Sequence, residues 1–198
     1  MNFELSDQQT AIVEAVRTVC SRFDMEYWDR LDRDHTFPHD FHAAMCEGGW
    51  LGVAMPEALG GAGLGILEAA LVMQAISESG AGMSGASAVH MNVFGLNPVV
   101  VFGSPEQQSR FLPPLIAGRE KACFAVTEPD AGLDTTRLKT FARKVDGGYQ
   151  VSGRKIWIST AQVADRMLLL ARTRTLESVG KPTEGLSLFY TALDRSRI

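Results

Sequence analysis

The sequence predicts an α+β protein in which a helical region precedes a region of strands. Apolar side chains recur at helical spacing over roughly the first 120 residues, and the pattern changes to a period of two after Lys121. No internal repeat interrupts either region. Because the helices come before the strands instead of alternating with them, we expect an α+β fold or two separate domains, divided as residues 1–120 and 121–198.

Two helices are predicted near the start of the chain. Ser6 and Gln9 form a capping-box pattern in front of an apolar stripe with helical spacing. Pro38 suits the first turn of a further helix, which we expect to end at residues 48–49, where two glycines follow each other. The buried faces of both helices consist of Ile12, Val13, Val16, Val19, Cys20, Phe23, Phe41, Ala44 and Met45.

Two more helices complete the predicted helical region. Residues 66–76 are apolar on nearly every side, which is typical of a helix inside a bundle. Residues 104–107 form a second capping box with proline at the first helical position, and we expect Pro113 and Pro114 to end that helix.

The second region reads as a series of short strands around one hairpin. Residues 146–148 carry an Asp-Gly-Gly turn signal between two alternating runs. A loop-like, glycine-containing stretch at 176–185 separates the last two runs. The predicted strands are 121–127, 137–145, 149–159, 166–173 and 186–193.

Composition limits the class of protein. The chain has 198 residues, 45% of them hydrophobic and 21% charged, with a formal net charge of −4, which argues against a basic nucleic-acid-binding protein. Cys20, Cys46 and Cys123 are far apart, so buried thiols in a reducing compartment are favoured over disulfides. Neither a signal peptide nor an apolar run of the ~20 residues that cross a bilayer is evident. We expect a cytoplasmic protein without a membrane span.

Several motifs have ordinary structural explanations. The glycines of residues 60–65 do not match the dinucleotide fingerprint and follow no clear strand, so a bend before a packed helix is favoured. His35, His39 and His42 lie close together in the sequence without a metal-binding spacing, and a solvated helix start is the favoured interpretation. His90 is isolated and reads as an interior histidine with satisfied hydrogen bonds. We predict no metal site.

Polar residues at the ends of two predicted strands are the strongest candidates for a site. Thr127 offers a hydroxyl and an amide, Pro129 fixes the exit of the chain, and Gly132 permits close backbone approach. Amides around such a turn can bind a phosphate or the polar edge of a flat ring. Trp157 offers a planar face, and Ser159 would lie on the same side of a strand. A plain turn beside a core tryptophan is the alternative.

The motifs in order resemble those of the acyl-CoA dehydrogenase family of flavoenzymes. The residues that carry the resemblance are "GGWLGVAMPEALGGAGLG", "FGSPEQQSRFLPPLIAGREKACFAVTEPDAGLDTT" and "GRKIWISTAQVADRMLLLART", and it covers nearly the whole chain. It implies a helical N-terminal domain, an incomplete, antiparallel β-barrel-like middle domain that contacts flavin, and a C-terminal four-helix domain that this chain lacks.

The resemblance also implies an FAD site and assigns residues to it. Thr127 and Ser159 would bond the polar edges of the flavin, with Ser159 near the N5 atom. Leu133 stands where the family commonly has a serine that contacts cofactor phosphate or thioester, so substrate binding at this position is in question. The implied FAD contacts are Phe124, Ala125, Val126, Thr127, Gly132, Leu133, Trp157, Ile158 and Ser159.

The activity implied is the oxidation of an acyl-CoA to its trans-2-enoyl-CoA, with hydride passing from Cβ to flavin N5. The family's base is a glutamate of the C-terminal domain, so no catalytic residue is assigned here, and Glu128 is a weak substitute because it sits in a turn. We expect a fatty-acid enzyme with electron-transfer flavoprotein as acceptor, assembled as a homo-oligomer (dimer or tetramer). The alternatives are an acyl-CoA oxidase, a flavin monooxygenase, or a truncated non-catalytic module.

Overall fold

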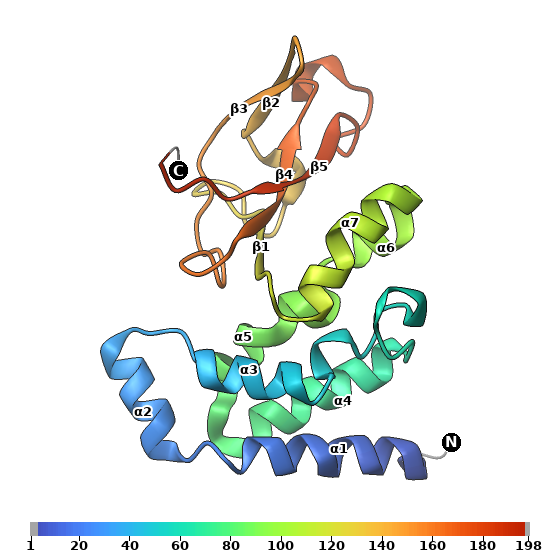
Figure 1. Cartoon of the computed structure of the whole chain (residues 1–198). Helices are drawn as coiled ribbons and strands as arrows, with labels where there is room; N and C mark the ends of the chain where they lie inside the picture. Colours follow the sequence, from blue (N-terminus) through green and yellow to red (C-terminus); the bar gives the residue numbers. More distant parts are fainter. Residues whose placement is uncertain (1–3, 197–198) are drawn as a thin grey trace. The chain divides into compact units, whose positions relative to one another are not determined.

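The computed structural model describes residues 4–196, and they belong to two compact units, Met1–Lys121 and Ala122–Ile198. The first unit is helical and the second holds a five-stranded sheet, so the predicted α+β class is confirmed (Figure 1). The helices are α1 (Asp7–Cys20), α2 (Met25–Asp34), α3 (His39–Glu47), α4 (Ile66–Ile76), α5 (Gly82–His90), α6 (Asn97–Phe102) and α7 (Pro105–Ile116). The strands are β1 (Ala122–Ala125), β2 (Phe141–Val145), β3 (Gly148–Ser152), β4 (Arg166–Arg172) and β5 (Leu186–Ala192).

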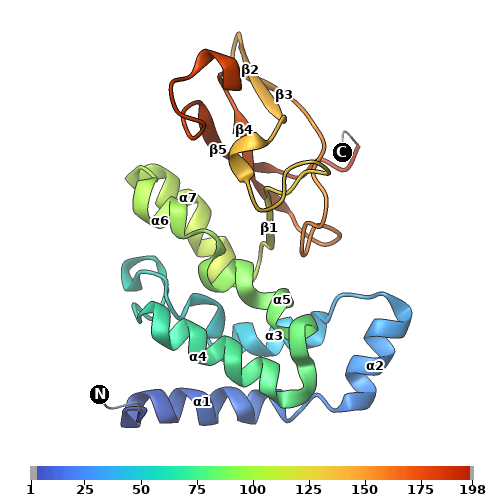
Figure 2. The same cartoon turned by 180° about the vertical axis from the view of Figure 1, so that it is seen from behind.

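The capping boxes predicted for α1 and α7 are both present. In α1 the Ser6 hydroxyl accepts a hydrogen bond from the Gln9 amide, and the Gln9 side chain accepts one from the Ser6 amide. Helix α1 lies alongside α4 in both views of the molecule (Figures 1 and 2). Their apolar faces meet in one core, which includes Ile12, Val13, Val16, Cys20, Ala69, Leu71, Val72, Ala75 and Ile76.

Helix α7 does not end at its two prolines, as the sequence predicted, but continues to Ile116. A proline removes its own amide donor, and here both lie in the last two turns, where only two intrahelical bonds are lost. Their fixed φ angles suit a helix, and the carbonyls of Pro113 and Pro114 accept bonds from Ala117 and Arg119. Buried Leu115 keeps the end of the helix packed.

The glycine-rich segment 60–65 forms a bend, as predicted, between a short 3₁₀ turn at Glu57–Leu59 and helix α4. Gly60 and Gly63 have φ angles of 94° and 64°, which favour glycine. A Cβ at Gly61 would lie 2.2 Å from the Met55 carbonyl oxygen. The bend therefore needs its glycines for conformation and close packing.

One long helical stretch, Ile66–Phe102, is apolar enough to cross a membrane by length and composition. It includes α4, α5 and α6 and two π-helical segments, Ser77–Ala81 and Met91–Gly95. Gly80, with a φ angle of 99°, breaks its helical geometry, and 44% of its most apolar part is buried within the unit. A core helix of a globular unit passes the same test, so the stretch is weak evidence for a membrane span.

The sheet is mixed, whereas the sequence predicted an antiparallel one. Strand β4 pairs in parallel with β1 and, at one position, with β2, and it pairs antiparallel with β5. The hairpin of β2 and β3 is antiparallel, around the predicted turn. About forty residues separate β1 from β4, and a connection of that length permits parallel pairing. Periodicity along one strand does not reveal such a pairing.

Candidate functional site

The end of strand β1 is the first wall of the candidate site. Phe124 is 38% exposed, whereas Ala125 is buried in a core cluster with Leu169 and Ala171 of β4. Val126 and Thr127 follow and are half-buried. The Thr127 carbonyl accepts a hydrogen bond of 3.0 Å from the Ile156 amide. This bond brings the end of β1 next to the segment that holds Trp157 and Ser159, although the two lie far apart in the sequence.

The turn after β1 presents backbone and one apolar side chain to solvent. The amides and carbonyls of Glu128 and Ala131 bond each other at 3.0 and 3.1 Å, which closes a tight turn. Gly132 is exposed, and a Cβ built on it would have no atom within 4 Å. The Leu133 side chain is fully exposed. The surface beside this turn is therefore open to a ligand.

The segment that holds Trp157 is not a strand, which corrects the prediction. Strand β3 ends at Ser152, and Trp157 and Thr160 adopt left-handed backbone conformations with φ angles of 58° and 68°. Alternation along a strand therefore gives no reason to place Ser159 on the same side as Trp157. The Trp157 ring is 87% exposed and Ser159 is exposed, whereas Ile158 packs against the core of the unit. Trp157 is consequently not a core tryptophan.

A buried ion pair lies between these two segments. Lys155 Nζ is 2.9 Å from a Glu128 carboxylate oxygen and donates a second hydrogen bond, of 2.8 Å, to the Val126 carbonyl. Glu128 also accepts bonds from the amides of Lys139 (2.6 Å) and Thr140 (2.9 Å) and from the Thr140 hydroxyl. The carboxylate is thus fully engaged by donors.

These contacts fix the charge state of Glu128. Burial alone would raise the pKa of the carboxyl group, but the bonds from the Lys139 amide, the Thr140 hydroxyl, the Lys155 ammonium and the Thr140 amide lower it to about 2. Burial lowers the pKa of Lys155, and the Glu128 carboxylate opposes that shift. A carboxylate held by so many donors is a poor proton acceptor, which argues against Glu128 as a catalytic base.

A hollow of about 600 Å³ lies beside the turn. Gly132 and Asp134 line it, together with residues of the loop after β4. Its walls carry both signs of charge, among them Arg137 and Glu177. Buried Arg172 also lines it, and its guanidinium donates to the carbonyls of residues 136, 182 and 184. Arg172 therefore ties the loops of this hollow together.

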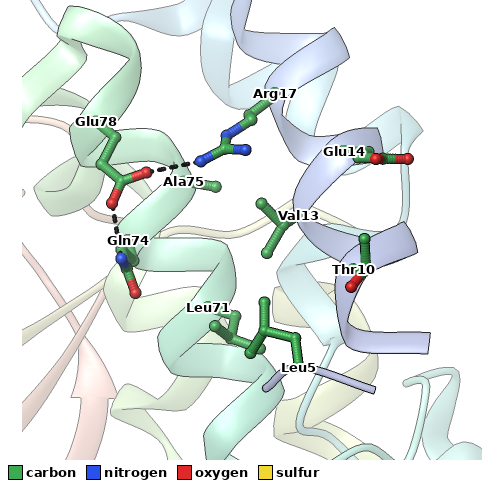
Figure 3. A pocket seen from close by; sticks show the side chains of 9 residues that line it. All are labelled: Leu5, Thr10, Val13, Glu14, Arg17, Leu71, Gln74, Ala75 and Glu78. Carbon is green, nitrogen blue, oxygen red and sulfur yellow. Dashed lines mark hydrogen bonds and ion pairs between the residues drawn. The ribbon is translucent and has the colours of Figure 1, made fainter. Parts of the chain in front are cut away.

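A second hollow, of about 330 Å³, lies between α1 and α4 in the helical unit. Figure 3 shows Leu5, Val13 and Leu71 on its apolar side. Three of its polar groups bond one another, since the Glu78 carboxylate accepts from Arg17 at 3.0 Å and from Gln74 at 2.7 Å. Groups that satisfy one another leave little to recognise a polar ligand, so the segments 124–133 and 155–159 remain the better candidate.

The histidines lie at the ends of helices or in the core of the helical unit. His35 ends α2 in a left-handed conformation, and His39 begins α3. His42 is buried, and its Nε2 lies 3.5 Å from Asn92 Oδ1. His90 Nδ1 lies 2.8 Å from the Ser87 carbonyl oxygen. Within residues 4–196, no group of three or more histidine, cysteine, aspartate or glutamate side chains is placed to hold a metal ion.

Cys123 is a buried core residue, as its place in the strand predicted. Burial raises the pKa of its thiol to about 11. A thiol that stays protonated at neutral pH is a poor nucleophile.

Lys155 was not predicted as a site residue from the sequence. The sequence shows it only as a lysine in front of an apolar run.

Comparison with known proteins shows the family to which both units are similar. The family described as "Acyl-CoA dehydrogenase, N-terminal domain" matches residues 6–119, and the corresponding middle-domain family matches residues 123–197. A mitochondrial 2-methylacyl-CoA dehydrogenase from Solanum tuberosum is 32% identical over 173 residues, which are 86% of this chain and 42% of that protein.

Solved structures are similar over almost the whole chain. The FAD complex of PigA has a TM-score of 0.86 and 25% identity, and covers 98% of this chain and 50% of its own. A glutaryl-CoA dehydrogenase in complex with glutaryl-CoA has a TM-score of 0.85 and 27% identity, over 97% of this chain and 48% of its own. The chain thus spans about half the length of the proteins it resembles.

Proposed function

This chain belongs to the acyl-CoA dehydrogenase family, and we propose that it forms part of a flavoenzyme that oxidises an acyl-CoA thioester to its trans-2-enoyl-CoA. The observation that carries the proposal is the hydrogen bond from the Ile156 amide to the Thr127 carbonyl. It brings together the two segments that the family uses to bind FAD. The similarity to FAD-containing and acyl-CoA-containing structures supports the same cofactor and substrate class.

The residues present fit a flat ring with an apolar face and polar edges. Trp157 and Phe124 expose aromatic surface that nothing in their own unit covers fully. Open space at Gly132 leaves its backbone accessible. Hydroxyl groups are available at Thr127 and Ser159. Large exposed aromatic side chains beside accessible hydrogen-bonding groups are typical of a ligand surface.

In this proposal the protein residues bind and orient. Trp157 and Phe124 contribute apolar contact, with Ala125, Val126 and Ile158 supporting the surface from behind. Thr127 and Ser159 hydrogen-bond the polar edges of the cofactor, and such bonds stabilise negative charge that develops there. FAD held by these residues would supply the two-electron acceptor for the hydride that leaves Cβ, and a base would take the proton from Cα. Gly132 and Leu133 would contact the cofactor phosphate or the thioester.

The proton acceptor is assigned to a group outside these two units. Glu128 is held ionised by its hydrogen bonds and serves the structure of the turn. The family places a glutamate in its C-terminal domain for this role. We propose that the complete site forms with that domain, in a cytoplasmic homo-oligomer (dimer or tetramer) that passes electrons to an electron-transfer flavoprotein.

The test is a flavin spectrum of the purified protein with FAD. Anaerobic addition of acyl-CoA thioesters of different chain lengths to the complete protein should bleach the flavin absorbance. If no thioester bleaches a bound flavin, the dehydrogenase proposal is wrong. Oxygen consumption during turnover would instead indicate the second candidate, an oxidase or monooxygenase.

A further inference from the structure

The segment that carries Trp157 is held in an unfavourable backbone conformation without support from a strand. It lies between the end of β3 at Ser152 and the start of β4 at Arg166. The φ angle of 58° at Trp157 is costly for a bulky residue, because its Cβ crowds the neighbouring backbone. Such conformations persist only when surrounding contacts impose them. Contacts elsewhere must therefore hold this segment.

The contacts on its N-terminal side converge on one buried carboxylate. Glu128 follows Thr127 directly, and Lys155 precedes Ile156 directly, so the ion pair flanks the bond between Thr127 and Ile156. Lys155 also binds the Val126 carbonyl, one residue before Thr127. Its ammonium group thus bonds the residues on either side of Thr127. On the C-terminal side, Arg195 donates to the carbonyls of residues 161, 162 and 164.

We propose that Glu128 and Lys155 are positioning residues that hold the Trp157–Ser159 segment against the end of β1. This inference rests on the proposed flavin-binding function of that surface. Neither side chain touches the ligand. The pair fixes the distance between the two walls, and through it the place where the Trp157 ring and the Ser159 hydroxyl are presented.

An ion pair suits this task better than apolar packing. The side chains of Glu128 and Lys155 are 6% and 10% exposed, and their charges are balanced by each other and by fixed backbone donors. Hydrogen bonds in defined directions specify one register, whereas apolar contacts tolerate sliding. The Trp157 ring can then stay exposed for a ligand while its backbone is held.

The experiment compares variants of the 198-residue chain. Glu128→Gln and Lys155→Met each break the pair, and Lys155→Arg keeps a cation that can bond Glu128. Two controls separate the possible causes. Lys139→Met removes an exposed lysine from its 3.0 Å pair with Asp130 in the same unit. Leu168→Ala removes a buried side chain from β4 and destabilises the unit without touching the pair.

Two measurements are made at a temperature where circular dichroism shows each variant folded. The first is hydrogen exchange of the Ile156 amide relative to the amides of β4. The second is the Kd for FAD, from the change in flavin fluorescence. We expect Glu128→Gln and Lys155→Met to accelerate exchange at Ile156 at least about tenfold more than exchange in β4, and to weaken FAD binding about tenfold.

The controls define the result. Leu168→Ala should accelerate exchange in β4 at least as much as exchange at Ile156, and it should leave the Kd for FAD within about twofold. Lys139→Met should leave both the exchange rates and the Kd for FAD close to those of the wild-type chain. Lys155→Arg should recover most of the FAD affinity. The inference is overturned if Ile156 is not selectively affected, or if it is affected while the Kd stays unchanged. If the wild-type chain alone binds no FAD, exchange at Ile156 decides whether the pair holds the segment, and the flavin spectrum of the complete protein decides the proposed function.

Discussion

Lys155 Nζ lies 2.9 Å from Glu128 Oε1, and both side chains are almost completely buried. This pair connects the turn after β1 with the segment before β4, which are adjacent only in the folded chain. Burying two charges costs desolvation energy, and the remaining hydrogen bonds of Glu128 offset part of that cost. Because the ion pair exists only while the Glu128 carboxylate is ionised, the stability of the β unit depends on pH.

The first prediction concerns the acid stability of the β unit. The pKa of Glu128 falls from 4.5 to about 2 on folding. A depressed carboxyl pKa contributes stability that is fully present above the unfolded pKa and is lost as the pH falls towards 2. The shift corresponds to roughly 3 kcal/mol. Hydrogen exchange of β4 amides should show this loss between about pH 5 and pH 2.

The variant Glu128→Gln should remove this pH dependence. It leaves Lys155 buried without its counterion, so the free energy of unfolding of the β unit at pH 7 should fall by roughly 3 kcal/mol. The same measurement on Lys139→Met should match the wild-type protein, because that pair is exposed. An unchanged acid profile in Glu128→Gln would show that other carboxylates control the transition.

The helical unit should lose stability at higher pH than the β unit. His42 is buried, and burial, the charge of Lys121 and that of His39 lower its pKa to about 4 against a weaker opposing bond from Asn92. A depressed histidine pKa contributes stability present above pH 6.5 and lost as the pH falls through 4. The expected loss is roughly 3 kcal/mol. Hydrogen exchange of α3 and α4 amides measures it.

A matched histidine variant controls this prediction. His35 is exposed and ends α2 with a left-handed backbone, so His35→Asn keeps the conformation and should leave the acid profile of the helical unit unchanged. The variant His42→Gln should flatten the profile between pH 6.5 and pH 4. The helical unit should lose stability first as the pH falls. If the amides of α4 and β4 lose protection together at one pH, this prediction is wrong.

Local signals predicted the helical unit well because its determinants lie close together in the sequence. The capping box of Ser6 and Gln9 and the apolar run of residues 66–76 mark α1 and α4 at the predicted places. Helices α2, α5 and α6 were not predicted, and α2 gave little signal because its ten mostly charged residues bury only Trp28. Its start is nevertheless encoded locally, since the Asp24 side chain accepts from the Tyr27 amide.

The β unit was predicted less well because its determinants are distant in the sequence. The parallel pairing of β1 with β4 and the pair of Glu128 with Lys155 each join residues at least 27 positions apart. The strand that leads to Thr127 was predicted from sequence, although β1 ends at Ala125, two residues before Thr127. The left-handed backbone at Trp157 was not, because an alternating apolar pattern favours an extended chain. Periodicity does not show that residues 124–133 and 155–159 belong to one site. The resemblance to the family is what predicted that they lie together.

The variant Trp157→Gly should separate binding from stability. Glycine relieves a left-handed conformation worth about 1–2 kcal/mol and costs roughly 0.5–1 kcal/mol in backbone entropy. Because the Trp157 ring is 87% exposed, little packing is lost. We expect the β unit to be as stable as the wild type or up to about 1 kcal/mol more stable, by urea denaturation, while FAD binding weakens.

A neighbouring position provides the control for Trp157→Gly. Thr160 also has a left-handed backbone, with a φ angle of 68°, so Thr160→Gly relieves the same kind of strain without removing the ring. FAD affinity should survive in Thr160→Gly. If Trp157→Gly loses several kcal/mol of stability, the ring is a packing residue and not a ligand surface.

The last prediction concerns Leu133, whose side chain is fully exposed beside the open backbone of Gly132. The family commonly has serine at this position, and a hydroxyl that donates to a charged phosphate contributes roughly 1.5–3 kcal/mol. Leu133→Ser should therefore lower the Kd for FAD about tenfold, measured by flavin fluorescence. Stability should change by less than about 0.5 kcal/mol, because the leucine packs against nothing. Leu133→Ala removes the apolar side chain without adding a hydroxyl, and it should not improve binding. An equal gain in both variants would mean that the leucine obstructs the site sterically, and no gain in either would place the phosphate or thioester elsewhere.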